Sequence, residues 1–469
     1  MARVTRVLAL PAVGAYYCED LAALQSRSIS LPERYTAVPV TPGFRRVRQV
    51  AEAVSVGLML DDGRVAWGDC VAVAYSGKAG RDPVFRAEDG MRTVEQTIAP
   101  RLQGREITTF RALAEEVDRL TEVVQVTRPL PPPPGMTRRE LLTAPLRMWR
   151  SGQGQGHDER EVETVVEQVE RPLHTAVRYG VSQALLRAVA LTRGVTMAEV
   201  IAEEWGLPPP DAPVPLHAQS GRERRHNADK MIARRVASLP HGLVDDIPEQ
   251  LGADGGKLVE YVRWLNERIR ELGGPDYHPT IHLDVHGALG QICEDDPGHL
   301  LGHIYALAAA ARPYPLRVES PVIMRSRDAQ IETLKRVREY VRLRKLNVQI
   351  VADEWANTLD DIRAFVAAQA ADVIQIKMPD LGSIHNAVEA ALVCQAAGVG
   401  AFLGGSCCET DLSAKVTVHV ALAVRPDILM AKPGMGVDEG IMLAQNEMAR
   451  TLAHIRARTS AADESLTAH

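Results

Sequence analysis

The sequence predicts an α/β protein in which a (β/α)₈ barrel follows a smaller α+β region. Beyond residue 208, short apolar runs alternate with helix-like segments, as a barrel of parallel strands requires. Four successive runs end on a charged side chain, the position that active-site residues take at the carboxyl mouth of such a barrel. Before residue 208, a strand-rich start gives way to helical spacing, which indicates an α+β unit.

The α+β region begins with strands. Residues 53–60 and 64–69 alternate in polarity around an Asp-Asp-Gly turn, which is a hairpin signal. Apolar residues then recur at intervals of three and four over residues 94–102 and 110–124. We therefore predict a hairpin followed by two helices.

A break in composition follows at residues 127–160, which contain four consecutive prolines and a stretch rich in glycine and glutamine. We interpret this segment as a poorly ordered surface insertion or linker, with partner binding as the alternative. Residues 161–193 carry an apolar stripe and predict a helix with Pro172 in its first turn, where a missing N–H costs nothing. Three prolines at 208–210 then mark a stiff boundary.

We assign residues 1–207 to the first domain and residues 208–469 to the barrel. Eight runs fit the barrel strands, namely 214–219, 239–244, 280–285, 316–319, 348–353, 373–377, 401–403 and 428–432. Helical spacing between them covers 258–272, 300–311, 327–343, 359–370 and 384–397. The right-handed crossover rule makes such a sheet parallel.

Composition narrows the classes of partner. The chain has a formal net charge of -6 and lacks both a basic block and the run of about 20 apolar residues that a membrane span needs, so we expect no nucleic acid or membrane partner. Pro11 and Gly14 interrupt the apolar start, which we interpret as a strand and turn instead of a secretion signal. None of the six cysteines forms a Cys-x-x-Cys pair, and reduced thiols in the cytoplasm are the simplest interpretation.

Three acidic residues predict a magnesium site. Asp284, Glu319 and Asp353 each end an apolar run, at spacings of 35 and 34 residues, close to one strand-helix repeat. Neighbouring strands of one barrel would therefore bring three hard oxygen ligands together, which suits Mg²⁺. The alternative is that these acids cap helices or pair with basic side chains.

Lys377 ends the next strand, inside an apolar Ile-Gln-Ile-Lys run. A lysine there is costly unless it is paired or functional. Beside a divalent cation its pKa would fall, and the neutral amine would serve as a general base. A salt bridge without catalysis and a Schiff-base lysine are the alternatives.

Other polar residues stand at the same mouth. His241 would lie at the end of the second strand and face Lys377 across the mouth. Gln219 and Gln375 lie at or near strand ends, where amides can hold a carboxylate or an amine. The Gly-Gly-Ser-Cys-Cys-Glu loop contains Ser406 and Cys407, and its backbone N–H groups at a helix start would bind an anion.

The chain resembles the 3-methylaspartate ammonia-lyases of the enolase superfamily. Matching segments cover 218–221, 227–231, 239–241, 282–284, 318–322, 350–355, 375–382, 404–407 and 432–440 in the barrel, with 68–70, 75–77 and 173–180 before it. The resemblance implies an enolase-like barrel with an N-terminal capping domain, a homodimer, Mg²⁺ and a supporting monovalent cation such as K⁺. The insertion at 127–160 is not usual in that family.

The resemblance also implies site roles and an amino-acid substrate. Asp284, Glu319 and Asp353 would bind the metal, Lys377 would remove the (S)-configured C3 proton, and His241 would act on the opposite face. The resemblance implies four substrate contacts, from Gln219, Gln375, Ser406 and Cys407. The metal would stabilise the enolate that forms, and ammonia would leave to give mesaconate.

Four positions depart from the family pattern. Ala74 stands where we expect glutamine near the amine, Phe402 where we expect tyrosine, Met430 where we expect leucine beside the C3 substituent, and Ser406 where we expect threonine. We therefore expect a substrate pocket of changed shape. A racemase or cycloisomerase of the same superfamily and a non-catalytic barrel are the alternatives.

Overall fold

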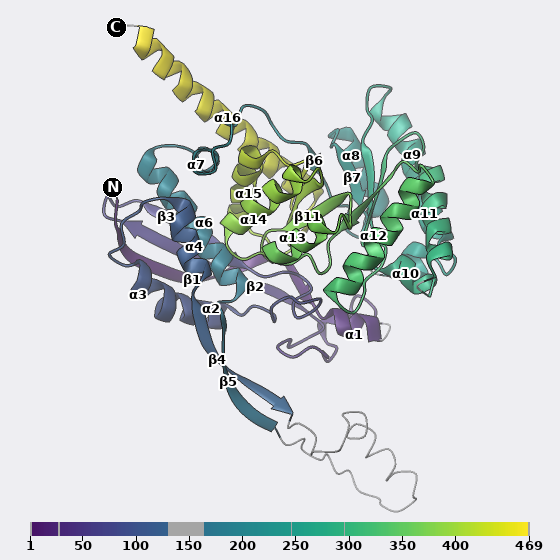
Figure 1. Cartoon of the computed structure of the whole chain (residues 1–469), viewed down its shortest axis with the longest axis horizontal. Coiled ribbons are helices and arrows are strands. Elements are labelled where there is room, and N and C mark those ends of the chain that lie inside the picture. Colours follow the sequence, from purple (N-terminus) through teal and green to yellow (C-terminus); the bar gives the residue numbers. More distant parts are fainter. Residues whose placement is uncertain (1, 27–28, 130–163, 245, 295, 468–469) are drawn as a thin grey trace, which may run out of the picture. The chain divides into compact units, whose positions relative to one another are not determined.

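The structure is a computed structural model that describes residues 2–26, 29–129, 164–244, 246–294 and 296–467 (Figure 1). It divides into two units, of which one comprises Met1–Asp118 with His174–His469 and the other Arg119–Leu173. This division separates only the segment that contains a hairpin from the rest of the chain. It does not test the sequence-based domain boundary at 207/208, which stays a prediction. Most of the predicted insertion, residues 130–160, lies outside the described residues.

An antiparallel sheet begins the larger unit. Its strands β1 (Val4–Glu19), β2 (Arg48–Leu60) and β3 (Val65–Val71) lie in that order, which confirms the predicted hairpin around residues 61–63. The helical elements in this part of the chain are α1 (Leu21–Ser26), η1 (Glu33–Tyr35), α2 (Ala87–Thr93), η2 (Val94–Ile98), α3 (Ala99–Leu102), α4 (Phe110–Asp118), α6 (Thr175–Arg193) and α7 (Met197–Glu204).

Two glycines bring α6 onto β3. A Cβ atom at Gly68 would collide with the backbone of Gly180 and Ala184, and one at Gly180 would collide with Cys70. The absence of both side chains lets helix and strand backbones touch, which fixes this helix on the sheet.

The smaller unit corrects two helix predictions. Residues 110–124 do not form one helix, because α4 ends at Asp118 and β4 (Thr121–Pro129) follows. Residues 161–193 are not one helix either, since β5 (Thr164–Pro172) precedes α6. Pro172 is thus the last residue of a strand, not part of a helical first turn. β4 and β5 pair antiparallel from Thr121↔Pro172 to Pro129↔Thr164, and this non-local pairing favours the strand state of a valine-rich sequence.

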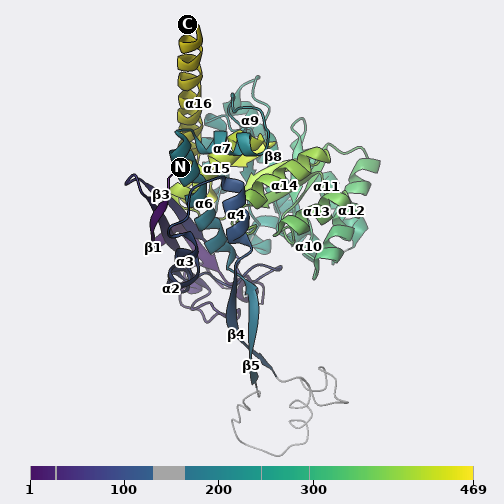
Figure 2. The same ribbon diagram turned by 60° about the vertical axis from the view of Figure 1, so that its left-hand side comes forward.

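The eight predicted barrel strands are confirmed as one closed parallel barrel (Figures 1 and 2). They are β6 (Leu216–His217), β7 (Ser238–His241), β8 (Thr280–Asp284), β9 (Leu316–Glu319), β10 (Val348–Ala352), β11 (Val373–Lys377), β12 (Gly400–Gly404) and β13 (Ile428–Met430). Asp284 pairs in register with Glu319, so their side chains leave neighbouring strands at the same level. β6 is shorter than predicted, which leaves Gln219 just beyond its end.

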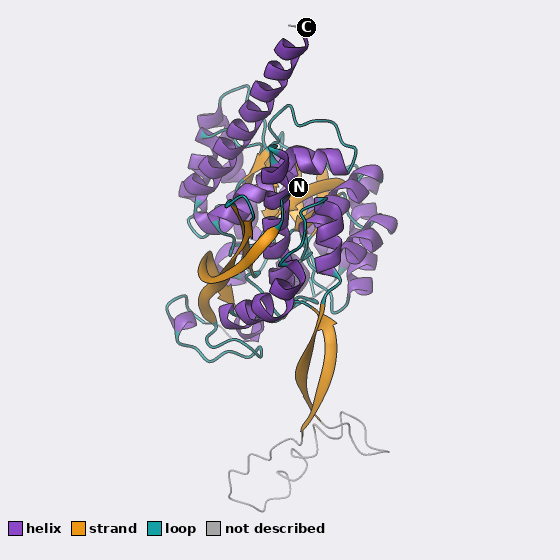
Figure 3. Cartoon of the chain, turned by 90° about the vertical axis from the view of Figure 1, so that its left-hand side faces the viewer, coloured by secondary structure: helices purple, strands orange, loops and turns teal. Residues whose placement is uncertain are grey.

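Helices surround the barrel strands (Figure 3). They include the five predicted helices, here α9 (Gly256–Gly273), α11 (Pro297–Ala311), α12 (Arg327–Leu343), α13 (Leu359–Ala367) and α14 (Ile384–Ala396). The remaining helical elements are α8 (Arg224–Ala233), η3 (Ile247–Leu251), α10 (Ala288–Ile292), α15 (Asp411–Val424), η4 (Pro433–Met435) and α16 (Val437–Thr467). Ser326, Thr358 and Thr410 cap α12, α13 and α15 through their hydroxyl oxygens, which satisfies N–H groups of the first turn.

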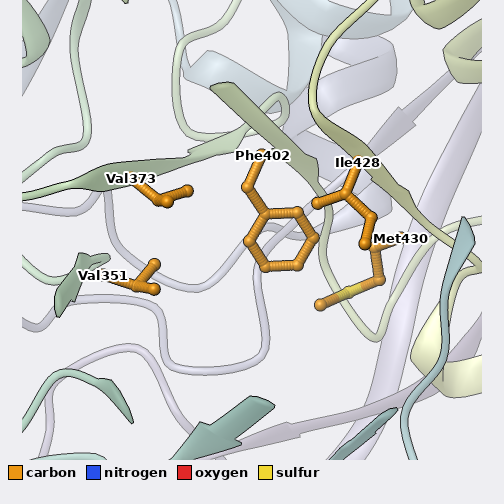
Figure 4. Close-up of a cluster of buried hydrophobic side chains, with 5 residues drawn as sticks. All are labelled: Val351, Val373, Phe402, Ile428 and Met430. Carbon is orange, nitrogen blue, oxygen red and sulfur yellow. The ribbon is translucent and has the colours of Figure 1, made fainter. Parts of the chain in front are cut away.

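Apolar side chains fill the barrel beneath its mouth. A buried cluster comes from four of its strands and consists of Val351, Val373, Phe402, Ile428 and Met430 (Figure 4). None of these residues is more than 3% exposed. Such a core leaves the polar residues at the carboxyl strand ends as the accessible part of the barrel. No helix among the described residues is both long and apolar enough to cross a membrane.

Candidate active site

A cavity of about 60 Å³ opens at the carboxyl ends of the barrel strands. The residues that we predicted for the site and that line it are Ala74, Gln219, His241, Asp284, Asp353, Gln375, Lys377, Ser406, Cys407 and Met430. Glu319 and Phe402 are fully buried and do not line this cavity. The structure therefore brings together most of the predicted residues around one small space.

Lys377 and Asp353 form an ion pair in the lining of this cavity. The Lys377 Nζ donates to Asp353 Oδ2 at 2.9 Å. Burial raises the pKa of Asp353, repulsion from Glu354 and Asp284 adds to this, and the pKa reaches about 6 although Lys377 and Arg81 oppose the shift. A carboxylate so poorly compensated by its neighbours favours a further cation.

The pKa of Lys377 differs from the sequence-based expectation. Burial lowers this pKa, but the nearby carboxylates Asp353 and Asp380 outweigh burial and the net pKa is raised. Among the protein's own groups, Lys377 is therefore held as an ammonium. The lowered pKa that we expected depends on the charge of the cation that the three acids would hold.

Glu319 is buried outside the cavity lining, and two side-chain nitrogens contact its carboxylate. It is 2.6 Å from His282 Nε2, and Gln375 Nε2 donates to its other oxygen at 2.5 Å. Burial and the charges of Asp284 and Asp353 raise its pKa well above the usual value. Gln375 is thus oriented by a predicted metal ligand and also faces the cavity.

His241 lies beside the acids. Its strand, β7, is opposite β11, the strand that carries the predicted base Lys377. The His241 Nε2 is 3.4 Å from Asp284 Oδ2, and its Nδ1 is 3.9 Å from Glu319 Oε2. The backbone of His241 has a positive φ of 62°, a strained conformation for a residue with a side chain. Strain at a cavity-lining histidine is typical of a functional position.

The three predicted metal ligands are carboxylates, the donor type that Mg²⁺ prefers, but of the three only Glu319 belongs to the group of possible ligands whose atoms lie within 4.8 Å of one another. Asp284, Glu319 and Asp353 come from three successive strands, and their mutual repulsion contributes to the raised pKa of Glu319. Among the described residues, one group of possible ligands lies within 4.8 Å of one another, namely His241, His282 and Glu319. That histidine-rich set matches the preferences of zinc, whereas Mg²⁺ prefers the oxygen donors of the three acids.

Ser406 and Cys407 do not lie at a helix start, which corrects the sequence-based prediction for the loop after β12. α15 starts at Asp411 with Thr410 as its N-cap, so Ser406 and Cys407 belong to the preceding turn and not to the helix start. Ser406 Oγ accepts from the Cys408 backbone N–H at 3.2 Å. All six cysteines are free thiols, as expected from the sequence.

A buried polar network holds this loop. Lys432 Nζ donates to the Gly404 carbonyl at 3.2 Å and to Glu409 Oε1 at 3.3 Å. Tyr179, from α6, donates to the same carboxylate at 3.2 Å, and Ser413 also donates to it. The network therefore joins the N-terminal helix α6 to the barrel loop that carries Ser406 and Cys407.

Replacing Glu409 by glutamine should destabilise the fold by about 3–5 kcal/mol, because a fully buried lysine loses its counter-charge. The glutamine N–H₂ group would also replace a carboxylate oxygen that accepts hydrogen bonds, and its N–H groups would point at the donors Lys432, Tyr179 and Ser413. Chemical unfolding would measure this change in free energy. Asp411→Asn is the control, because that exposed acid pairs with Lys415 at the surface and should cost under about 1 kcal/mol. Equal costs for the two variants would contradict the prediction.

Sequence reasoning missed several residues at this site. Tyr75, Arg81, His286 and Glu354 also line the cavity. His286 Nδ1 lies 3.1 Å from Glu354 Oε1, and its pKa is raised to about 9 because the attraction of Glu354 outweighs burial. Glu354 directly follows a predicted ligand, and this adjacency was the one signal that the sequence offered for it.

Comparison with known proteins identifies the family. The family model described as methylaspartate ammonia-lyase C-terminus matches residues 208–457, and the one described as methylaspartate ammonia-lyase N-terminus matches residues 2–130 and 150–206. The chain belongs to the methylaspartate ammonia-lyase family. The interruption of the N-terminal match lies within the segment that we interpret as an insertion.

Relatives support this membership over nearly the whole chain. Methylaspartate ammonia-lyase 2 of Carboxydothermus hydrogenoformans is 43% identical over 97% of this chain and 99% of that protein. The solved magnesium complex of β-methylaspartase from Clostridium tetanomorphum is 40% identical, with a TM-score of 0.81 over 97% of this chain and 100% of that chain. The Citrobacter amalonaticus methylaspartate ammonia-lyase that contains (2S,3S)-3-methylaspartic acid is also 40% identical, with a TM-score of 0.83 over the same shares.

The methylaspartate ammonia-lyase fold is the enolase-like fold that we expected. Muconate lactonizing enzyme from Pseudomonas fluorescens is only 15% identical but has a TM-score of 0.54 over 90% of this chain and 85% of that chain. At this identity the likeness concerns the fold alone. It consists of a closed eight-stranded barrel together with a separate antiparallel sheet.

Proposed function

We propose that this member of the methylaspartate ammonia-lyase family eliminates ammonia from 3-methylaspartate or a related 3-substituted aspartate, giving mesaconate or its analogue. The observation that supports this most directly is the Lys377–Asp353 pair at 2.9 Å in the cavity at the barrel mouth. The amine that we propose as the base thus lies beside a predicted metal ligand, and it would accept a proton once the charge of a bound cation lowers its pKa. Family membership gives the reaction class, a carbon–nitrogen lyase.

Asp284, Glu319 and Asp353 would hold Mg²⁺, as their oxygen donors and successive strands suit that ion. When bound, the ion supplies positive charge that stabilises a substrate carboxylate as negative charge develops. A supporting monovalent cation such as K⁺, a homodimer and a cytoplasmic location remain predictions from the family resemblance and the sequence.

The side chains then divide the work on the substrate. Lys377 would take the (S)-configured C3 proton, and His241 would act from the opposite face. Gln219, Gln375 and the Ser406–Cys407 turn would hold the carboxylates and the amine, which keeps the C–N bond in position for cleavage. As the C3 proton leaves, the electron pair forms the alkene and ammonia departs from C2.

The positions that depart from the family pattern bear on the choice of substrate. Ala74 lines both the catalytic cavity and a neighbouring cavity of about 90 Å³, which Gln219 and Cys407 also line. Because the alanine side chain is small, it does not separate the catalytic cavity from the neighbouring cavity. A substituent on the substrate amine could therefore occupy the neighbouring cavity. Met430 lines the catalytic cavity with a flexible side chain that can adapt to C3 substituents.

Phe402 has a different environment from the predicted substrate contact. It is fully buried and packs with Met430, away from the cavity lining (Figure 4). In this structure it shapes the pocket by supporting Met430. Direct contact of Phe402 with a substrate stays a prediction.

An assay with Mg²⁺ over a panel of C3- and N-substituted aspartates, which follows the released ammonia or alkylamine together with the alkene product, tests the proposed function. We expect release from 3-methylaspartate and from at least one N-alkyl analogue, in that case as the free alkylamine. Ala74→Gln should lose the N-alkyl substrates and keep 3-methylaspartate, because the longer amide would occupy the adjoining space. Inactivity on every member of the panel would defeat the proposal, and deuterium incorporation without ammonia release would favour a racemase.

A further inference from the structure

Arg81 is a fully buried cation that the reaction outlined above does not use. It belongs to a loop of the N-terminal part of the chain, and its side chain is 2% exposed. It lines the catalytic cavity beside Asp353 and Lys377. Burying a guanidinium in this way is costly unless its partners hold it, so those partners indicate its role.

The guanidinium of Arg81 contacts Asp353, which pairs with Lys377, and Asp380, which lies in the turn after Lys377. Its Nε donates to Asp380 Oδ2 at 2.8 Å, and its Nη2 lies 3.7 Å from Asp353 Oδ1. The backbone N–H of Asp380 donates to the Lys377 carbonyl at 2.9 Å, which closes the turn directly after the lysine. One side chain thus reaches a predicted metal ligand and the turn that fixes the predicted base.

The loop that carries Arg81 is itself anchored to the barrel. The Arg81 backbone N–H donates to the Lys78 carbonyl at 3.0 Å, which closes a turn. Asn357 Nδ2, from the loop after β10, donates to the Ala79 carbonyl. A Cβ atom at Gly80 would already lie 3.6 Å from the Trp355 ring. The guanidinium is therefore held in place by backbone and packing on both sides.

One nitrogen of Arg81 is unsatisfied. Its Nη2 is buried and has no hydrogen-bond partner among the residues that the structure describes, although the Asp353 carboxylate is nearby at 3.7 Å. A buried N–H group without an acceptor is destabilising, so this nitrogen gains most from any small movement of Asp353 toward it. The other oxygen of Asp353 already accepts from Lys377.

We propose that Arg81 is a positioning residue that sets the distance and orientation between Lys377 and Asp353. It does so through Asp380 on one side and through Asp353 itself on the other. The N-terminal part of the chain thereby completes the catalytic centre that the barrel strands begin. This inference rests on the proposed function, because it assigns Arg81 to the same site.

The test compares Arg81→Gln and Arg81→Lys with the wild-type protein. For Arg81→Gln we expect kcat for ammonia release to fall about 10–100-fold, the usual effect of losing a residue that orients a metal ligand, with KM changed less than about threefold. Arg81→Lys should recover only part of this loss, because an ammonium cannot contact two carboxylates as a planar fork does.

Calorimetric titration of the metal-free proteins with Mg²⁺ gives a second measurement. Arg81→Gln keeps the three acids and removes a neighbouring positive charge, so its Mg²⁺ dissociation constant should be equal to or lower than that of the wild type. General disruption of the site would instead weaken Mg²⁺ binding and would overturn the proposal. A wild-type kcat in Arg81→Gln would overturn it as well.

Two further variants separate this role from simple docking of the N-terminal part. Arg111→Gln breaks another pair between this part and the barrel, Arg111 with Glu389 at 2.7 Å on the surface, and should keep wild-type kcat. Asp380→Asn should lower kcat, and the double variant with Arg81→Gln should lose less than the two single losses combined, because both act through one contact. If the effects of the two substitutions on kcat were strictly additive in free energy, the proposed action of Arg81 through Asp380 would be contradicted. Failure of the proposed function is distinguishable, since it would show as a wild-type protein without ammonia release or Mg²⁺ binding.

Discussion

Lys377→Met is expected to lower kcat for ammonia release by about 10²–10⁴-fold, the usual contribution of a general base. The substitution keeps a long side chain beside Asp353 but removes the amine that lies 2.9 Å from that carboxylate. The three acids remain, so Mg²⁺ should still bind. Steady-state assays with (2S,3S)-3-methylaspartate, together with Mg²⁺ titration, would measure both effects.

Lys415→Met is the matched control for this experiment. Lys415 also pairs with an aspartate, Asp411 at 3.0 Å, but it lies on the surface of α15. Its replacement should leave kcat unchanged. If Lys377→Met kept more than about a tenth of the wild-type kcat, Lys377 would be a structural cation. The proposed proton transfer would then need another acceptor, and His241 is the other acid/base residue of the site.

Glu319→Gln is expected to weaken Mg²⁺ binding at least about 100-fold and to abolish ammonia release under ordinary Mg²⁺ concentrations. Changes in the groups around a metal ligand can already cost about 10–100-fold in metal affinity or in activity, so removal of a charged ligand that contacts the ion directly should reach or exceed that range in affinity. Glutamine preserves the shape, and His282 and Gln375 would still lie around it. Calorimetry would measure the dissociation constant.

Glu447→Gln supplies the control, because Glu447 is a partly buried carboxylate paired with His419 at 3.2 Å and does not line the cavity. This variant should bind Mg²⁺ as the wild type does. Should Glu319→Gln also bind normally, Glu319 would not be a ligand, and the predicted set of three acids would be wrong.

The same site predicts how Mg²⁺ affinity varies with pH. Burial and the neighbouring carboxylates raise the pKa of Asp353 to about 6 and raise the pKa of Glu319 well above its usual value. Protons and the cation compete for these oxygens, so affinity should fall as pH is lowered through about 6. Titrations between pH 5 and 8 would follow this loss, and an affinity independent of pH over that range would contradict it.

The barrel and the identity of its charged strand ends were accessible from the sequence. Each strand and helix has a local period, and Asp284, Glu319, Asp353 and Lys377 each follow an apolar run. Parallel strands of one barrel end at one face, so their order along the chain was enough to predict that these side chains meet. The structure places Asp284, Asp353 and Lys377 around one cavity, and it buries Glu319 in contact with Gln375, which lines the same cavity.

The smaller unit was less predictable. The sequence over β4 and β5 carries apolar residues at positions that suit a helix as well as a strand, and the helix predictions there were wrong. The strand state depends on pairing between residues 121 and 172 and their neighbours, which lie far apart in the chain. Local spacing does not contain that contact.

The sequence by itself determined the repeat of strands and helices, the three acids and the lysine at their ends, and the family pattern that they match. Only the tertiary structure decided which groups hold those residues in place: His282 and Gln375 on Glu319, and Arg81 between Asp353 and Asp380. The physical reason is range. Periodicity is set by residues a few positions apart, whereas the groups that orient this site are separated in the chain by 37 to 299 residues and meet only when the chain folds.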